Sequence, residues 1–386
     1  MKILIHMGDS YPNEGPNAKR MRTFYDQFKQ SGHEVKVLAP CSDENESNPD
    51  TVYCRTIPLK KKTSLNRLLN QVFFGISSLL TSFHVGKVDV VITTAPPALI
   101  SPFGWMIAKI KRAKLVYDVR DIWPDVALEM GSFTEKSMYC RVFTFVRNFM
   151  LRHSDMVTTV SPGKVEKLKL YQPSANIYFV TNGIDETFLT NEEDQSVIRE
   201  YDLDHGYNVV YIGNLGWAQG LRQLLFVAER AQSLKMPVRF KLFGSGVDEK
   251  NLKEYALRHG LHNVTFPGRL PNRQMYTILK NADLSFVSLL NENMKDSVPT
   301  KMFEALSVGC PVLLAAVGDA ADILNESRLG IAVKPNDNEG LWKAFEKMYY
   351  TMPEILKNKD HAMKLMVAKY SRQKAAEKME QLISGL

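Results

Sequence analysis

Short apolar segments alternate with helical patterns along this chain, and the alternation occurs twice. The first series opens with the apolar residues 2–7, a helical pattern closed by Gly32, and a second apolar segment at 34–39. The second series restarts at 209–212 and continues with a helical pattern over 222–233. Strand–helix–strand units of this kind build doubly wound parallel sheets, whose ligands bind at the carboxyl ends of the strands. Further strands are predicted at 88–93, 114–119, 155–160 and 177–180, and then within 240–246, 263–270, 282–290, 311–316 and 330–335.

Length and composition fit a globular protein of two domains. A chain of 386 residues buries a sizeable core, and 45% apolar with 24% charged residues is ordinary for a soluble protein. The four cysteines are far apart, which argues against a zinc cluster and fits reduced thiols in the cytoplasm. The apolar segments are too short for a membrane span, and the opening MKILIHMG is too short for a secretory signal. A cytoplasmic location is therefore expected.

Positive charge is concentrated in the first half of the chain. Residues 1–186 carry 24 Lys and Arg against 18 Asp and Glu, and residues 51–114 carry ten against Asp89 alone. Such a stretch suits nucleic acid, an anionic membrane face or substrate phosphates, although a solvated basic face is the simpler interpretation. The basic residues lack interleaved aromatics and a recognition motif, so we do not expect nucleic acid as a partner.

Residues 64–83 predict a strongly amphipathic helix. We expect its apolar face to pack against the sheet, and its basic flank to be suited to contact with anionic lipid. That flank is formed by Lys60, Lys61 and Lys62. The apolar face is formed by Leu65, Leu68, Leu69, Val72, Phe73, Ile76, Leu79, Leu80 and Phe83.

The segment 296–315, DSVPTKMFEALSVGCPVLLA, predicts a loop, a short helix and a buried strand. Ser297 is suited to cap the helix and Pro299 to its first turn. The amides and dipole at such a helix start attract anions, and Lys301 in the first turn adds a positive charge. Glu304 lies on the same face, where its carboxylate can accept hydrogen bonds from two vicinal hydroxyls. A capped helix with a surface Lys–Glu pair is the simpler alternative.

Four stretches in order resemble the motifs of retaining glycosyltransferases of the GT-B fold. The first three are RDIWPD at 120–125, TNGID at 181–185 and GNLGWAQG at 213–220. The fourth is an acidic-x7-Glu pattern, with Pro-Thr-Lys inside and Gly-Cys-Pro-Val after it, formed by Asp296 and Glu304. The resemblance implies two Rossmann-like, doubly wound parallel-sheet domains of the α/β class that face a central cleft. It also implies a C-terminal helix that crosses back to the first domain.

The resemblance places the domain boundaries as well. The acceptor-binding domain is expected at 1–187, with the helix at about 363–386 packing on it, and the nucleotide-sugar domain at 203–362. Asp202 and Asp204, in the segment between them, form a DxD look-alike. Two carboxylates alone bind a metal ion weakly, and this pair precedes a strand instead of ending one. We interpret them as linker charges and expect no metal site.

In the resembled family the first acid of the motif contacts the transferred sugar and the second holds the ribose. Asp296, where the family usually has Glu, would thus face the sugar, and Glu304 the ribose. Lys301 and the helix N-termini would neutralise the diphosphate, because Asn214 and Gln219 stand where many members carry Arg and Lys. Further donor-site residues implied are Gly216, Gly220, Gly244, Ser245, Arg269, Leu270, Pro299 and Thr300; a surface role explains Arg269 equally well.

Two loops of the first half add candidates for acceptor and phosphate contacts. Asp121 could accept a proton from an acceptor hydroxyl or merely bind it, and Arg120 could contact phosphate. Asp118 is explained as well by an internal Arg–Asp pair that steadies the loop. Gly15 could let backbone approach a diphosphate, although turn chemistry alone explains a glycine there. Arg-Asp-x-Trp-Pro is similar to a bacterial polysaccharide subgroup that includes N-acetylfucosaminyl transferases.

The resemblance implies a function without cofactor or metal. A hexosyl group, an N-acetylated amino or deoxyamino sugar, would move with retention from a UDP-sugar to a glycan or lipid-linked acceptor in O-antigen or capsule assembly. Asp121, Asp296 and Lys301 would carry the catalysis, in the cytoplasm or at the inner membrane face. The alternative is a non-hydrolysing UDP-sugar 2-epimerase of the same fold, which needs several titratable groups around the sugar that we cannot assemble from this chain.

Overall fold

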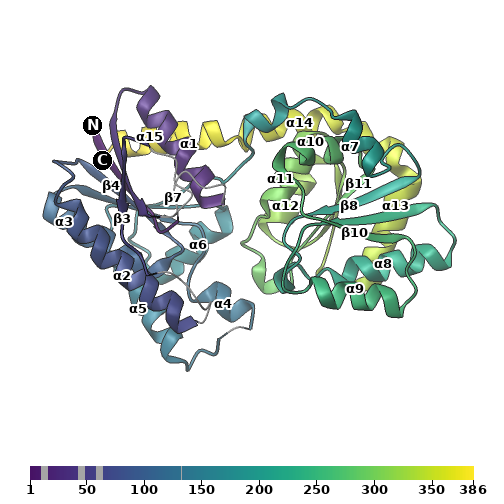
Figure 1. Ribbon diagram of the computed structural model, residues 1–386, viewed down its shortest axis with the longest axis horizontal. Coiled ribbons are helices and arrows are strands. Elements are labelled where there is room, and N and C mark those ends of the chain that lie inside the picture. The colour runs from purple at the N-terminus through teal and green to yellow at the C-terminus, as the bar shows by residue number, and fades with distance from the viewer. Residues whose placement is uncertain (10–15, 42–47, 58–63, 132) are drawn as a thin grey trace. The chain divides into compact units, whose positions relative to one another are not determined.

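The chain folds into two compact units. The first comprises Met1–Asn182 and Arg372–Leu386, and the second comprises Gly183–Ser371. Each unit is a parallel sheet with helices on both of its faces (Figure 1). The computed structural model describes residues 1–9, 16–41, 48–57, 64–131 and 133–386.

Seven parallel strands form the sheet of the first unit, in the order β3-β2-β1-β4-β5-β6-β7. The chain builds outward from β1 in one direction and from β4 in the other, so their junction is the switch point at which doubly wound sheets bind ligands. Strand β3 was not predicted from the sequence. The strands are β1 (Lys2–His6), β2 (Glu34–Pro40), β3 (Thr51–Cys54), β4 (Val90–Ala95), β5 (Lys114–Val119), β6 (Met156–Thr159) and β7 (Ile177–Phe179).

Helices cover both faces of this sheet. One face packs against a cluster that includes Phe74, Ile107 and Val146, from three different helices, and the other against α1 and the C-terminal helix α15. The helices of the first unit are α1 (Pro16–Gln30), α2 (Ser64–Ser82), η1 (Ala98–Ile100), α3 (Ser101–Lys111), α4 (Asp125–Glu129), α5 (Met138–His153), α6 (Pro162–Tyr171) and α15 (Arg372–Ser384).

The expected return of the chain's last helix to the first domain is confirmed. Helix α15 buries Ala376 and Met379 in the same cluster as Phe24 of α1. The return begins later than predicted, because α14 (Lys359–Lys369) buries Ala362 and Met366 in the core of the second unit. The chain therefore returns to the first unit only at Arg372.

The predicted packing of the apolar face of helix α2 against the sheet is wrong. The side that faces the sheet carries Gly75 and Ser78 instead, and Ser78 Oγ lies 2.9 Å from Nε2 of the buried His6. These small residues let α2 pack closely, since a β-carbon at Gly75 would lie 2.2 Å from the Phe103 ring. Most of the apolar stripe points away from the core, although Leu79 packs against it. Six residues of the predicted core face are exposed: Leu69, Val72, Phe73, Ile76, Leu80 and Phe83.

Six parallel strands form the sheet of the second unit, in the order β10-β9-β8-β11-β12-β13. The switch point lies between β8 and β11. The strands are β8 (Tyr207–Ile212), β9 (Val238–Phe243), β10 (Val264–Gly268), β11 (Leu284–Ser288), β12 (Val312–Ala315) and β13 (Gly330–Val333). The helices besides α14 are η2 (Glu186–Thr190), α7 (Gln195–Glu200), η3 (Trp217–Gln219), α8 (Arg222–Ser233), α9 (Glu249–Arg258), α10 (Asn272–Asn281), η4 (Glu292–Met294), α11 (Thr300–Ser307), α12 (Asp319–Ser327) and α13 (Asn338–Leu356).

The chain enters the second unit at Gly183, earlier than the sequence placed the boundary. Gly183 has a φ of 48°, and a β-carbon on it would lie 2.2 Å from the Tyr370 carbonyl oxygen. The segment expected as a linker between 187 and 203 belongs to this unit, because Val197 and Ile198 of α7 are buried in its core. Among the described helices, none has the length and hydropathy that a membrane crossing demands.

Candidate functional site

Helix α11 begins at Thr300, with Pro299 as its N-cap. Pro299 occupies the N-cap position that was predicted for Ser297, and its side chain makes no capping hydrogen bond. The backbone N–H of Ser297 instead donates to the Met294 carbonyl oxygen over 2.9 Å, which closes a turn after η4. The amides and dipole at a helix start favour an anion.

The side chain of Lys301 reaches from α11 to the end of β8. Its Nζ donates to the Tyr211 hydroxyl over 2.7 Å and lies 4.1 Å from the centroid of that ring. The Tyr211 hydroxyl donates in turn to the Asn214 carbonyl oxygen over 2.7 Å. Lys301 keeps part of its surface exposed, but desolvation of its ammonium group lowers its pKa from 10.5 to about 7, against an opposing effect of Glu304. An anion placed beside this ammonium would restore its charge.

The loops after β8 and β9 touch through two glycines. Gly213 has a φ of 148° and Gly244 a φ of 138°, and a β-carbon on Gly244 would lie 1.8 Å from the Gly213 carbonyl oxygen. A β-carbon on Gly213 would lie 2.9 Å from Lys301 Nζ. Both positions therefore require glycine, and the Lys301 ammonium lies directly against this backbone.

Asn214 and Gln219 lie on either side of Gly216. A β-carbon on Gly216 would be 2.6 Å from Asn214 Nδ2 and 2.9 Å from Gln219 Oε1. Gln219 Oε1 is buried and has no hydrogen-bond partner within the described part of the chain, while the Gln219 carbonyl oxygen accepts from Ser288 Oγ of β11. Gly220, with a φ of 55°, ends η3 in the left-handed conformation. Neutral amides thus occupy the loop between β8 and α8.

The next loops continue the same edge of the sheet. The Leu215 amide donates to the Ser245 carbonyl oxygen over 3.0 Å, and Arg269 Nε donates to Ser245 Oγ. Arg269 is exposed, and Leu270 is half-buried against the core of the second unit. Ser245 therefore connects the loop after β8 to the loop after β10.

The remaining candidates of the second unit lie on or before α11. Pro299 and Thr300 are half-buried at the helix start, and Glu304 is half-buried one turn after Lys301. Asp296 is buried, with 6% of its surface exposed, in the loop that leads from β11. All predicted donor-site residues of this unit thus lie on α11 or on loops at the carboxyl ends of β8, β9, β10 and β11.

In the first unit, Arg120 follows β5. Its guanidinium donates to the Pro96 carbonyl oxygen and lies 4.0 Å from Asp9 Oδ2, so it joins the loops after β1 and β4 at the switch point. Arg120 Nε is buried and has no hydrogen-bond partner among the residues that the structure describes. Asp121 is half-buried beside it. The predicted Gly15 lies outside the described residues.

Asp118 is the acid of a buried ion pair. It is fully buried, and it accepts hydrogen bonds from Arg20 Nη2 at 2.9 Å, Arg20 Nε at 3.1 Å and Thr158 Oγ1 at 2.7 Å. Arg20 also donates to the carbonyl oxygens of Val180 and Thr181, just before the chain leaves the first unit. The internal Arg–Asp pair is therefore the interpretation that the structure supports for Asp118, with Arg20 of α1 as the partner.

Replacing Asp118 with Asn tests this structural role. We expect the free energy of unfolding to fall by about 2–3 kcal/mol, because the buried Arg20 cation would lose its charged acceptor. Urea denaturation measures the change, and Asp121→Asn, half-buried just after β5, should stay within about 0.5 kcal/mol of the wild type. Equal stabilities of the two variants would contradict the role.

A group of potential metal ligands lies at the other end of β8. His205 Nδ1 is 2.8 Å from Asp202 Oδ1 and 2.9 Å from Asp204 Oδ1, and these carboxylates raise the pKa of His205. Asp202 also pairs with Arg239. The group precedes β8, whereas Lys301 contacts the end of this strand, so it takes no part in the candidate site.

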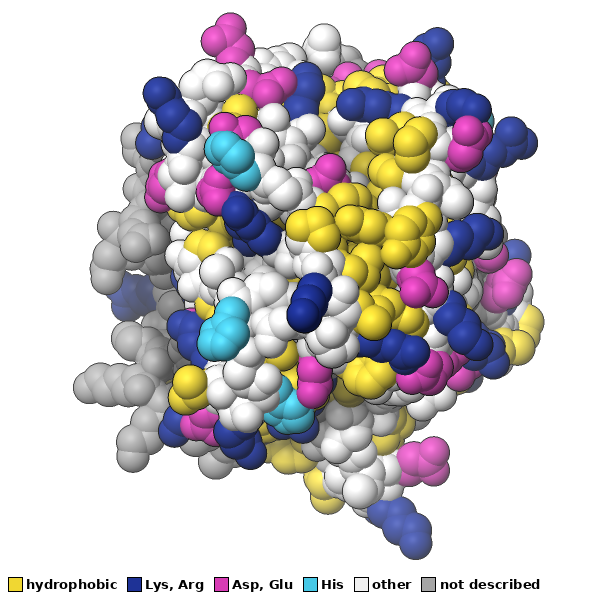
Figure 2. Space-filling model, turned by 90° about the vertical axis from the view of Figure 1, so that its right-hand side faces the viewer, with side chains coloured by type: hydrophobic (Ala, Val, Ile, Leu, Met, Phe, Trp, Pro, Cys, Tyr) yellow, Lys and Arg dark blue, Asp and Glu magenta, His cyan; other side chains and the backbone are white. Residues whose placement is uncertain are grey.

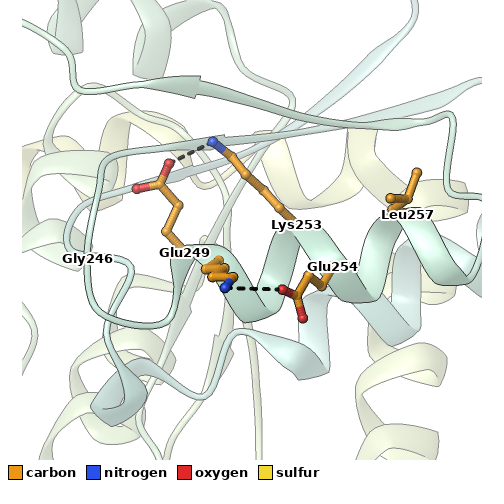
Figure 3. Close-up of a pocket in the computed structure, with 6 residues that line it drawn as sticks. Gly246, Glu249, Lys253, Glu254 and Leu257 are labelled. Atoms are coloured by element: carbon orange, nitrogen blue, oxygen red, sulfur yellow. Dashed lines mark hydrogen bonds and ion pairs between the residues drawn. The ribbon is translucent and has the colours of Figure 1, made fainter.

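A shallow pocket of about 450 Å³ runs along α9 (Figure 3). Two ion pairs cross it, Glu249–Lys253 at 2.7 Å and Lys250–Glu254 at 3.9 Å. The four charged groups that line it are thus paired with one another. The pocket therefore presents less to a ligand than the edge around Lys301.

Comparison with known proteins defines the class. Sucrose-phosphate synthase from Thermosynechococcus elongatus superposes with a TM-score of 0.82 at 16% sequence identity, over 100% of this chain and 99% of that one. HepE of Anabaena, solved in complex with UDP-glucose, superposes with a TM-score of 0.76 at 16% identity, over 100% of both chains. These likenesses show the fold, and the predicted GT-B architecture is confirmed.

Two family models then identify the activity. Residues 18–188 match the model described as Glycosyltransferase Family 4, and residues 197–351 match the model described as Glycosyl transferases group 1. The chain is a glycosyltransferase with one domain of each kind.

Two curated relatives span most of the chain. WcaI of Escherichia coli (strain K12), named as a glycosyl transferase of colanic acid biosynthesis, is 24% identical over 341 residues, which cover 82% of this chain and 83% of WcaI. WbjE of Pseudomonas aeruginosa, named as a glycosyltransferase, is 23% identical over 327 residues, which cover 82% of this chain and 79% of WbjE. Both relatives therefore match across the two domains.

Proposed function

We propose that this chain is a retaining glycosyltransferase that uses a UDP-sugar. The hexosyl group, an N-acetylated amino or deoxyamino sugar, would pass to a glycan or lipid-linked oligosaccharide during assembly of a cell-surface polysaccharide. The observation that carries the proposal is the desolvated Lys301 ammonium, held between Tyr211 and Gly213 beside the start of α11. A cation and a helix start at one place are suited to a diphosphate. The names of WcaI and HepE's UDP-glucose complex support the pathway and the nucleotide.

Each side chain of the site has a proposed role in the transfer. The acceptor oxygen bonds to the anomeric carbon on the face from which UDP departs with the electron pair of the broken C–O bond. The acceptor hydroxyl passes its proton to a phosphate oxygen of the departing UDP. Lys301 and the starts of α8 and α11, both without a side-chain cap, stabilise the charge that builds on the diphosphate. We assign Glu304 to the ribose, Asp296 to the sugar and Asp121 to the acceptor side. Arg120 is assigned to a phosphate contact.

We propose that the transfer needs neither a metal ion nor a cofactor, because Lys301 and the helix starts supply the positive charge. Excess EDTA should then leave the rate of sugar transfer unchanged.

Incubation with UDP-N-acetylglucosamine without an acceptor tests the 2-epimerase alternative. An epimerase would form a new sugar nucleotide from this donor alone. We further propose that the enzyme works in the cytoplasm at the inner membrane face, where residues 51–114 contact anionic lipid.

A thermal-shift screen against nucleotide sugars tests the donor class. A ligand at a hundred times its dissociation constant stabilises a protein by about 2.7 kcal/mol, which is a clear rise in melting temperature. UDP and UDP-N-acetylamino sugars should raise it, whereas ADP- and GDP-sugars should not. A rise with GDP- or ADP-sugars alone would contradict the assigned nucleotide.

The pKa of Lys301 predicts how donor affinity depends on pH. The amine is charged below about pH 7 and neutral above it in the free enzyme, and only the charged form pairs with the diphosphate. UDP binding should therefore take up a proton at pH 8, and affinity should fall by up to about tenfold per pH unit between pH 7.5 and 9.5. Calorimetry in buffers of different ionisation enthalpy measures this uptake. An uptake that persists in Lys301→Ala would contradict the assignment.

A further inference from the structure

Helices α2, α3 and α5 form one layer on the first sheet. Their inward residues, among them Phe74, Ile107 and Met150, belong to a single buried cluster. Helix α3 contacts both α2 and α5, and Figure 1 shows the three on one flank of the first unit. Their opposite sides therefore face away from the sheet together.

These outward sides carry an unusual number of exposed apolar side chains. On α2 the exposed apolar side chains recur at helical spacing along one stripe. The exposed fraction of their surface reaches 61% for Leu80. On α5 the exposed fraction reaches 70% for Phe145 and 72% for Met138. We call this set the outer apolar face: Leu69, Val72, Phe73, Ile76, Leu80, Phe83, Met106, Ile110, Met138, Val142 and Phe145. Exposed apolar side chains gathered on neighbouring helices are typical of an interaction site.

The charges carried by the three helices themselves are of one sign. None of the three helix sequences contains Asp or Glu. Exposed basic residues flank the apolar side chains: Arg67, Lys109, Arg112, Arg141 and Arg152. The end of the second unit in Figure 2 is different, because its band of hydrophobic side chains is bordered by both basic and acidic groups. The predicted flank of Lys60, Lys61 and Lys62 lies outside the described residues.

We propose that the outer apolar face docks this enzyme on an anionic lipid bilayer. The aromatic and aliphatic side chains would enter the headgroup–acyl boundary, and the basic residues would meet lipid phosphates, as interfacial helices do. The surface extends beyond residues 51–114 to α5, and its benefit to catalysis rests on the proposed lipid-linked acceptor. A second copy of this chain fits less well, since a self-complementary contact through this face would bring like charges together.

Sedimentation of the full chain with vesicles tests the proposal. The probes are vesicles of phosphatidylcholine alone and with 30% phosphatidylglycerol, at low and high salt. We expect binding to the anionic vesicles that weakens with salt, and little binding to the neutral ones. The double variant Phe73→Glu/Leu80→Glu and the single Phe145→Glu should each lose at least tenfold in affinity, since a charge replaces an exposed apolar group that docking would bury in the bilayer. Lys109→Gln and Arg141→Gln should each lose about fivefold.

Controls separate docking from folding and from donor chemistry. Leu257→Glu changes a side chain that is 82% exposed on α9 of the second unit, and it should bind vesicles as the wild type does. UDP release without acceptor should be unchanged in every docking variant, so failure of the proposed transfer and failure of docking remain distinct. The proposal would be overturned if the wild-type protein does not bind anionic vesicles. It would also be overturned if the protein forms a dimer in solution that Phe73→Glu dissociates.

Discussion

Replacement of Lys301 with Ala is expected to lower kcat for UDP release from the donor by about 10²–10³-fold. The ammonium lies against the Gly213 backbone beside the start of α11, where the charge of a departing diphosphate would build. Stability should not fall, because the protonated form of this desolvated amine is disfavoured by the fold and the variant removes that cost. Steady-state assay of UDP release and thermal unfolding at pH 6.5 measure both quantities.

The chain offers a matched control for this variant. Lys280 also donates to a tyrosine hydroxyl, that of Tyr276 at 3.1 Å, in the same unit but on α10 and away from the site. Lys280→Ala should leave kcat unchanged. If the two variants show the same kinetics, the loss of a Lys–Tyr pair, and not of a phosphate contact, is the cause, and the assignment of Lys301 fails.

Replacement of Glu304 with Ala should weaken UDP binding by at least about 100-fold and abolish measurable transfer. Each hydrogen bond to a charged group contributes about 1.5–3 kcal/mol, and two ribose hydroxyls would be lost together. Glu304 is half-buried one turn beyond Lys301, so its truncation removes little packing and the fold should persist. Calorimetric titration with UDP measures the affinity.

A nucleotide without the 2′-hydroxyl sharpens the test of Glu304. Wild-type enzyme should bind UDP more tightly than 2′-deoxy-UDP, and Glu304→Ala should bind the two alike, since the partner of that hydroxyl is gone. Glu339→Ala, at an exposed pair with Arg230, is a matched change that should keep the preference. A preference that survives in Glu304→Ala would place the ribose elsewhere.

Much of the fold follows from local patterns in the sequence. Buried parallel strands are continuous apolar runs, so twelve of the strands could be predicted from short segments such as Val90–Ala95, where all six residues are buried. Helix α2 shows the limit of the same reasoning. Periodicity defines the apolar face of a helix but not its direction, and here the small residues Gly75 and Ser78 take the inward side. Only packing against Phe103 and His6 distinguishes the two orientations.

The site divides in the same way. The loops at strand ends and the start of α11 could be predicted as site elements from the sequence, because the topology places them on one edge of the sheet. Tyr211 and Ser288 were missed, since a tyrosine or serine that ends a buried strand looks like any strand residue in the sequence. For Tyr211 the available signal was its position two residues before Gly213. Arg20 and Asp118 are 98 positions apart in the sequence, so their ion pair could be recognised only in the folded chain.

Hydrogen exchange with and without saturating UDP tests most directly where the donor binds. Opening of loops and helix starts exposes their amides, and a bound diphosphate should slow exchange there. Protection is predicted at residues 213–222, 244–246, 268–270 and 299–304, and it should shrink in Lys301→Ala. Protection confined to the first unit, around residues 8–9, 95–97 and 120–121, or to the pocket along α9, would contradict a donor site built on Lys301.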